Sequence, residues 1–136
     1  MRVFWALLPL IAGGPLYAQA TLADAARAAQ AAWLAHDSQS LVGQGATLVV
    51  QIPGANPSGA LERAQAAELL WRYQRAAVER DVRVGRVTEL PAGTGLVELL
   101  REYAVGGTED VRRETIFLRY RRTGTRWELT ELRAGP

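Results

Sequence analysis

The second half of the chain contains four segments of mixed apolar and polar residues that short glycine-containing links separate. The segments lie near 82–90, 95–105, 111–122 and 126–133, and the links read "PAGTG", "GGTED" and "TGT". Alternating segments are typical of strands, and links this short join neighbouring strands as antiparallel hairpins. The sequence therefore predicts a four-stranded antiparallel meander, which limits the possible folds more than any other feature of the chain.

A helix, a strand and a second helix are predicted before this meander. The first helix, over 21–37, has an apolar stripe formed by Leu22, Ala26, Ala29 and Trp33. The second helix, over 61–80, has a stripe formed by Ala66, Leu69, Leu70, Tyr73 and Ala77. Between them, "ATLVVQIPG" at 46–54 alternates as a strand and ends in a Pro-Gly turn. The predicted fold class is α+β, with the order helix, strand, helix and four-stranded meander.

The N-terminal stretch "MRVFWALLPLIAGGPLYAQA" has the order of a secretory signal peptide. One arginine precedes an apolar run from Val3 to Ala12, and the small-x-small sequence Ala18-Gln19-Ala20 ends the stretch. The apolar run is shorter than the roughly 20 residues that span a bilayer. We predict a signal peptide over 1–20, cleavage after Ala20, one domain over 21–136, and a periplasmic or secreted product without a membrane anchor.

Composition removes several kinds of chemistry. The chain has no cysteine and no lysine, which excludes thiol and Schiff-base catalysis. A single histidine, His36, is too few for a zinc site. The net charge of +2 does not indicate nucleic-acid binding, and the arginines of "RRETIFLRYRR" at 112–122 are better explained by pairing with acids on neighbouring strands. We predict no catalytic, cofactor-binding or metal-binding residues and no cofactor.

Four motifs occur in a characteristic order along the chain. They are "AAWLAHD" at the end of the first helix, "LVVQIPG", "SGALERAQAAELLWRYQ" and the terminal "RWELTELR". Over about 22–133 this order resembles the nuclear transport factor 2-like superfamily, which includes ketosteroid isomerase and polyketide cyclases. The resemblance implies a cone-shaped, curved antiparallel sheet packed on N-terminal helices. "AQA" at 64–66 and the spacing from Trp127 to Arg133 resemble a small exported bacterial branch of unknown function.

His36 and Asp37 are the one histidine–carboxylate pair that is adjacent in sequence. Neighbouring residues of a helix point about 100° apart, so the two side chains do not form a catalytic dyad with each other. A histidine near a helix C-terminus interacts favourably with the free carbonyls there. We expect a structural role for His36.

The superfamily contains enzymes, binding modules and dimerisation domains, so the fold alone leaves the function open. The residues expected to line the cone are Trp33, Leu70, Tyr73, Glu114 and Tyr120. We expect an exported, non-enzymatic domain that binds a small apolar ligand or a protein partner through the cone or the sheet face. The alternative is an isomerase, dehydratase or cyclase that uses a buried glutamate and a tyrosine.

The sheet face opposite the helices is expected to be bare and to pair two copies of the chain. The residues predicted to form this homodimer interface are Val97, Leu99, Tyr103, Phe117 and Arg119. Aliphatic, aromatic and arginine side chains together are typical of interface cores. The alternative assignment reverses the two faces, so that these residues line the cone instead.

Overall fold

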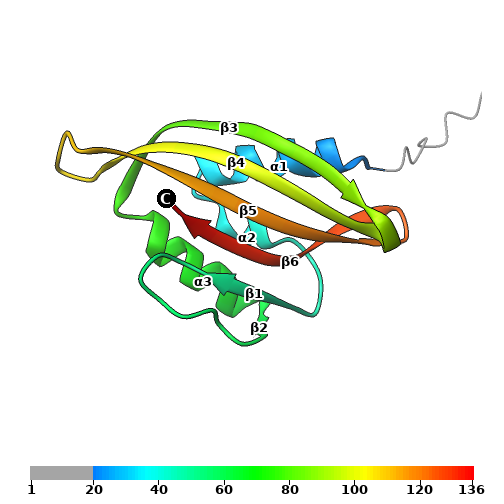
Figure 1. Ribbon diagram of the computed structural model, residues 1–136. Helices are drawn as coiled ribbons and strands as arrows, with labels where there is room; N and C mark the ends of the chain where they lie inside the picture. The colour runs from blue at the N-terminus through cyan, green and yellow to red at the C-terminus, as the bar shows by residue number, and fades with distance from the viewer. Residues whose placement is uncertain (1–19) are drawn as a thin grey trace, which may run out of the picture.

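The computed structural model describes residues 20–136, so the predicted signal peptide lies outside the described residues except for Ala20. Helices cover one face of a curved six-stranded sheet, and in the view of Figure 1 α1 lies behind β3, β4 and β5. The helices are α1 (Leu22–Leu34), α2 (Ser38–Val42) and α3 (Arg63–Gln74), with a 3-10 turn η1 (Pro91–Gly93). The strands are β1 (Thr47–Gln51), β2 (Leu61–Glu62), β3 (Ala77–Leu90), β4 (Thr94–Val105), β5 (Val111–Thr123) and β6 (Arg126–Gly135).

The predicted meander is confirmed, because β3, β4, β5 and β6 pair antiparallel in sequence order. The full strand order is β2-β1-β6-β5-β4-β3. Strand β1 lies parallel to β6, with Val50 opposite Leu132. The α+β class with a curved sheet on N-terminal helices is therefore the fold of the chain.

The second predicted helix is too long at its C-terminal end. Helix α3 ends at Gln74, and residues from Ala77 onward form the first part of β3 instead of a further helical turn. Here Ala77 lies opposite Val105, and the pairing with β4 continues to Leu90. This long ladder outweighs the modest helix preference of the segment, as tertiary pairing commonly does.

The stretch around His36 ends one helix and begins the next. His36 has a left-handed backbone, with a φ of 52°, and its backbone N–H donates to the carbonyl of Trp33 at 3.0 Å. The N–H of Asp37 donates to the carbonyl of Ala32 at 2.9 Å, which completes a helix C-terminal motif. The Asp37 carboxylate then accepts from the N–H of Ser40 at 3.1 Å and caps α2.

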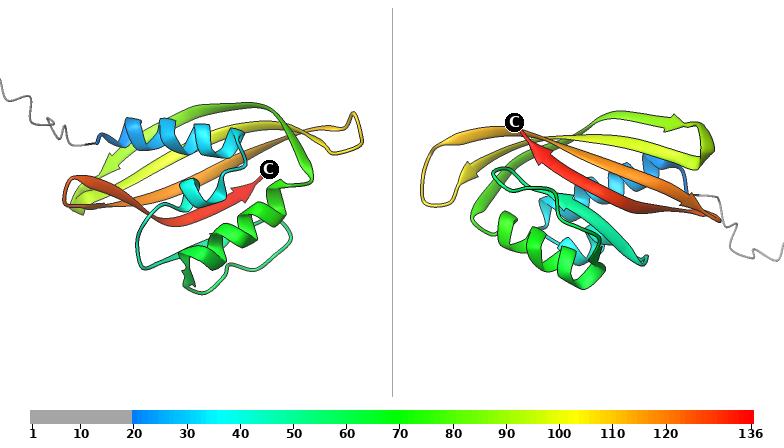
Figure 2. Two further views of the ribbon diagram at one scale, coloured as in Figure 1. Left: turned by 180° about the vertical axis from the view of Figure 1, so that it is seen from behind. Right: turned by 60° about the horizontal axis from the view of Figure 1, so that its bottom comes forward.

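Helices cover one face of the sheet and leave the other face open (Figure 2). The helix-covered face supplies the core, which includes Val97 and Leu99 of β4 and Ile116 and Leu118 of β5. The open face carries Phe117, which is 38 % exposed, and no helix covers it among the described residues.

The predicted interface is wrong for three of its five residues. Val97 and Leu99 are 1 % and 0 % exposed, and Tyr103 shares their face and stacks on Arg101. Cross-strand partners project to the same side of a sheet. Leu96 lies opposite Arg119, Glu98 opposite Phe117 and Leu100 opposite Thr115, so the even-numbered residues of β4 share the open face with Phe117 and Arg119.

Candidate functional site

The five residues expected to line the cone all lie on the helix-covered side of the sheet, three of them on the helices themselves, but they do not line one pocket. Trp33 and Leu70 are completely buried, and Leu70 belongs to the hydrophobic core. Tyr73 and Glu114 contact each other directly. Tyr120 lies six residues beyond Glu114 on β5 and lines a different hollow. The interior therefore has two distinct ends.

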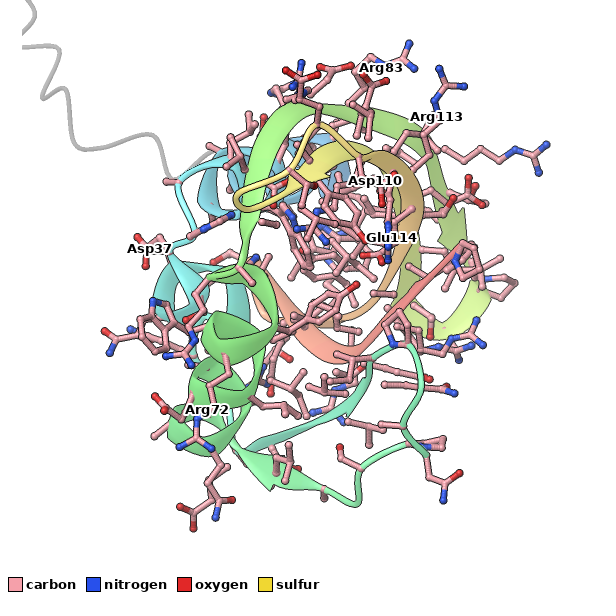
Figure 3. All side chains as sticks on the ribbon, turned by 90° about the vertical axis from the view of Figure 1, so that its left-hand side faces the viewer. Asp37, Arg72, Arg83, Asp110, Arg113 and Glu114 are labelled. Carbon is pink, nitrogen blue, oxygen red and sulfur yellow. The ribbon has the colours of Figure 1, made fainter. Side chains whose placement is uncertain are left out.

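At one end, a buried arginine holds two buried carboxylates. We call Arg101, Glu79, Glu114, Tyr73 and His36 the Arg101 cluster. Nε of Arg101 donates to Oε2 of Glu79 at 2.8 Å, and Nη2 donates to Oε1 at 2.5 Å. Nη1 donates to Oε1 of Glu114 at 3.1 Å. Figure 3 shows Glu114 directed inward, whereas Arg72, Arg83 and Arg113 point away from the molecule.

Tyr73 and His36 complete the contacts of the two carboxylates. The Tyr73 hydroxyl donates to Oε2 of Glu114, and Nε2 of His36 lies 3.0 Å from Oε1 of Glu79. Burial raises the pKa of Tyr73, and its hydrogen bond to Glu114 raises that pKa further. Tyr73 is thus a stable proton donor. His36 does have a structural contact, but its ring reaches Glu79 on β3 rather than the carbonyls of its own helix.

Aromatic rings surround the guanidinium group of Arg101. Its Cζ lies 3.8 Å from the ring centroid of Tyr103, 5.1 Å from that of Trp33 and 5.6 Å from that of Tyr73. Burial by itself lowers the pKa of Arg101, but the hydrogen bonds and charge of Glu79 and the charge of Glu114 outweigh it and leave the pKa raised. The cation therefore stays charged inside the fold, with ring faces as additional partners.

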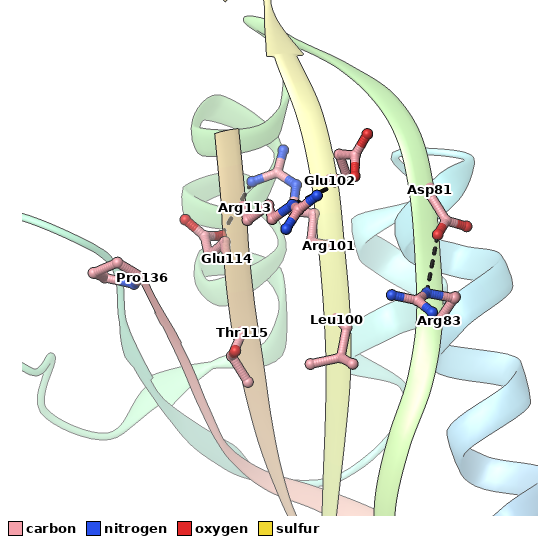
Figure 4. Close-up of a pocket in the computed structure, with 9 residues that line it drawn as sticks. All are labelled: Asp81, Arg83, Leu100, Arg101, Glu102, Arg113, Glu114, Thr115 and Pro136. Atoms are coloured by element: carbon pink, nitrogen blue, oxygen red, sulfur yellow. Dashed lines mark hydrogen bonds and ion pairs between the residues drawn. The ribbon is translucent and has the colours of Figure 1, made fainter. Parts of the chain in front are cut away.

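On the opposite side of the same strands lies a shallow, charged hollow of about 350 Å³ (Figure 4). Exposed ion pairs border it, with Arg83 3.1 Å from Asp81 and Arg113 3.6 Å from Glu102. Such exposed pairs contribute little and are screened by salt. Arg101 and Glu114 of the Arg101 cluster are also among the residues that line this hollow (Figure 4).

At the other end of the interior is a smaller, apolar hollow, which we call the Tyr120 pocket. Its volume is about 140 Å³, and α1, the segment from α2 to Gln44, β5 and β6 surround it. Its lining residues are Ala25, Ala28, Ala29, Ser40, Leu41, Val42, Gly43, Gln44, Tyr120, Trp127 and Leu129.

Two polar atoms at this pocket have no hydrogen-bond partner. The Tyr120 side chain is buried and its hydroxyl makes no hydrogen bond within the described part of the chain. The buried indole Nε1 of Trp127 also has none. Burial raises the pKa of Tyr120, so the phenol stays protonated. Sequence reasoning selected Tyr120 but missed the pocket, although the alanines of the first helix were a signal that side chains there leave space.

No group of three or more His, Cys, Asp or Glu side chains in residues 20–136 is placed to hold a metal ion. None of the helices in that range is both long enough and apolar enough to cross a membrane.

No family model matches the chain, and no curated protein matches it. Solved structures do match it. A ketosteroid isomerase-like protein from Erwinia carotovora atroseptica is 16% identical, with 87% of this chain and 97% of that chain covered and a TM-score of 0.69. The chain has the nuclear transport factor 2-like fold. The predicted resemblance is confirmed.

Two further solved structures share the nuclear transport factor 2-like fold with this chain. A DUF4783 family protein from Bacteroides uniformis is 14% identical, covering 79% of this chain and 93% of that one, with a TM-score of 0.65. A hypothetical protein with a ketosteroid isomerase-like fold from Catenulispora acidiphila, in complex with trimethylamine, is 15% identical, covering 85% of this chain and 87% of that one, with a TM-score of 0.63. At these identities the likeness shows a shared fold, which hosts many functions.

Proposed function

We propose that the chain is an exported, non-enzymatic domain that binds a small apolar ligand at the Tyr120 end of its cone. The observation that carries this proposal is the state of Glu114. One of its oxygens accepts from Arg101 and the other from Tyr73. A general base needs an oxygen that can take a proton from a substrate, whereas each oxygen of this carboxylate already accepts a hydrogen bond and one of them is paired with a buried cation.

The remaining free volume of the interior supports binding rather than chemistry. The Tyr120 pocket has an apolar floor of Ala29, Leu41 and Leu129, all buried, and no charged side chain lines it. Ligand sites commonly combine such a floor with a few polar groups that orient the ligand. The Catenulispora acidiphila protein, which holds trimethylamine, supports the idea that this fold accommodates small molecules.

The export part of the proposal comes from the N-terminal sequence. The order of charge, apolar run and "AQA" fits a leader that is removed after Ala20. We expect the intact mass of protein recovered from the periplasm to correspond to residues 21–136. Recovery of the full-length chain from the cytosol would contradict export.

Binding and turnover can be measured together. The exported protein is incubated with a panel of small neutral ring compounds, with ligand-observed NMR for binding and mass spectrometry for conversion. We expect saturable binding with no new product. A product that forms with wild-type protein and not with Glu114→Gln, folded by circular dichroism, would instead support an isomerase, dehydratase or cyclase.

A second candidate function, self-association, follows from the open face. Phe117 and Leu100 are each 38 % exposed there, and Arg133 lies over the Phe117 ring at 5.5 Å. Arg119 and Arg133 each lie 3.7 Å from Glu131, so both signs of charge surround the apolar side chains. A face with both signs can complement a copy of itself across a twofold axis.

Sedimentation of the exported protein tests this second candidate. We expect a dimer at micromolar concentration, and a folded monomer for Phe117→Glu. Gln39→Glu, at an exposed position of α2 away from the open face, is a control for added charge. A monomeric wild-type protein, or a Phe117→Glu variant that remains dimeric, would contradict the sheet-face dimer.

A further inference from the structure

We infer that the Tyr120 pocket selects a neutral, single-ring molecule that carries one hydrogen-bond acceptor. This inference rests on the proposed function and goes further by naming the site and the class of ligand. The size of the pocket, its apolar lining and the hydroxyl of Tyr120 each limit the ligand independently.

The pocket is large enough for one ring. Its volume of about 140 Å³ is close to that of apolar cavities of about 150 Å³ that bind benzene. Exposed residues form the rim, among them Ala28, Gly43 and Gln44, so a ligand can enter without movement of a strand. On the α1 side the wall consists of alanine side chains, which is why the helix leaves this space.

The Tyr120 hydroxyl is the donor that a ligand in the pocket would meet. It makes no hydrogen bond to the described residues, and it is not among the buried polar atoms without a partner, so its oxygen keeps accessible surface. Nε1 of Trp127 has no partner either, but it has almost no accessible surface. A ligand oxygen or nitrogen that accepts from Tyr120 would add a hydrogen bond to the complex.

No charged residue lines the pocket, and this limits the net charge of a ligand that binds there. None of the lining residues is acidic or basic, so an ionised ligand would lose its hydration with no counter-charge inside the pocket. The pocket therefore favours a neutral molecule. The fully buried charges of Arg101, Glu79 and Glu114 lie at the other end, where they are paired with each other. Arg63, which donates to the carbonyl of the lining residue Val42 at 2.8 Å, is paired with Glu128.

A matched pair of probe compounds separates the contribution of the hydrogen-bond acceptor to binding from the contribution of the ring. Benzonitrile has a nitrogen that accepts a hydrogen bond, and phenylacetylene has nearly the same size and shape without that acceptor. Binding is followed by NMR, including the indole N–H resonance of Trp127, and by the infrared stretch of the nitrile, which shifts when its nitrogen is hydrogen-bonded. We expect wild-type protein to bind benzonitrile about 3- to 10-fold more tightly than phenylacetylene.

Three variants test the site. Tyr120→Phe is expected to weaken benzonitrile binding and leave phenylacetylene unchanged, which removes most of the preference. Ala25→Leu fills the pocket from α1 and is expected to weaken both probes by about tenfold or more. Ala23→Leu makes the same change at an exposed position of α1 and is expected to change neither.

The outcomes distinguish this inference from the proposed function. Three outcomes would overturn the inference. Both probes bind equally well, or Ala25→Leu binds them as tightly as wild type does. In the third outcome neither probe binds, as expected if the pocket holds only water. If other compounds of the panel still bind without conversion, the proposed function stands and the ligand class is wrong. Glu114-dependent conversion would overturn the proposed function itself.

Discussion

The two ends of the interior differ in the charge of their buried polar groups. Glu114 and Tyr120 lie on the same face of β5, six residues and therefore about 20 Å apart. At Glu114 both carboxylate oxygens have donors and the neighbouring cation has three aromatic rings around it. At the Tyr120 pocket the polar groups are neutral, and the phenol and the indole N–H of Trp127 make no hydrogen bond to the described residues. The indole N–H of Trp33 beside Arg101 also lacks a partner.

This difference follows from the cost of burial. An unpaired charge in the interior is far more destabilising than an unpaired hydroxyl, so a fold with buried ions must saturate them. Unpaired neutral donors are tolerable, and they leave binding capacity beside an apolar hollow. We therefore expect mutations at the Arg101 cluster to affect stability, and mutations at the Tyr120 pocket to affect binding.

The largest expected effect comes from Arg101→Met. This change leaves Glu79 and Glu114 buried without their cation, and loss of one partner of such a pair typically costs about 3–5 kcal/mol of unfolding free energy. Urea denaturation measures it. Arg113→Met, at an exposed ion pair, is the matched control and should change stability by about 0.5 kcal/mol or less.

Further substitutions in the Arg101 cluster should restore part of the stability that Arg101→Met loses. Adding Glu79→Gln and Glu114→Gln to Arg101→Met removes the uncompensated charges and should recover part of the lost stability. If Arg101→Met is as stable as wild type, or if the triple variant is less stable than the single one, the contrast between the two ends is wrong.

A pair of tyrosine substitutions compares the two ends directly. Tyr73→Phe removes a donor to the Glu114 carboxylate and should cost about 1–2 kcal/mol of unfolding free energy. Tyr120→Phe removes a hydroxyl that makes no hydrogen bond, so we expect a change within about 0.5 kcal/mol or a small gain. Thermal unfolding of both variants under one condition gives the comparison, and equal losses would refute it.

Packing at the pocket end can be tested at Gly95. A Cβ there would lie 2.7 Å from both methyl carbons of Leu22 and 3.2 Å from the Trp127 ring. We expect Gly95→Ala to cost about 1–3 kcal/mol, since overpacking forces side chains from their rotamers. Gly59→Ala is the control, because a Cβ at Gly59 meets nothing within 4 Å. Unfolding in urea measures both variants. If Gly95→Ala leaves the free energy of unfolding unchanged, the packing at the pocket end can adjust to the added methyl group.

The smallest effect concerns Asp37, whose cap holds α2 beside the pocket. Hydrogen bonds from the side chain and then the backbone of Ser40 lower the pKa of Asp37 below 3.8. The stabilisation by Asp37 is therefore fully present above that value and is lost as the pH falls through the lowered pKa. The urea midpoint of Asp37→Ala should lie below that of wild type at roughly pH 7, and the gap should close at roughly pH 2. A gap that persists in acid would contradict this account.

Much of the fold could be predicted because its signals are local. Alternation and short glycine links predicted the meander, and the apolar stripe from Leu22 to Trp33 predicted α1. The alternation of β5 also grouped Glu114 with Ile116, Leu118 and Tyr120, which the structure buries together. Each of these signals depends on residues a few positions apart.

The candidate sites depend on residues that are distant in sequence. Arg101 meets Glu79 across 22 positions, and Tyr73 meets Glu114 across 41. Glu79 entered the cluster only because α3 ended early and the following residues joined β3. The Tyr120 pocket likewise needed α1, α2, β5 and β6 together before its unfilled space existed.

The sequence by itself determined the number and type of the main elements and the antiparallel order of the meander, because periodicity and turn chemistry act along the chain. Only the tertiary structure decided which phase of β4 is buried. Leu96 and Leu100 are apolar in one phase, and Val97 and Leu99 in the other, so alternation in this strand does not identify a face. Register with β5 and the packing of α1 buried Val97 and Leu99, and with them placed Arg101 inside.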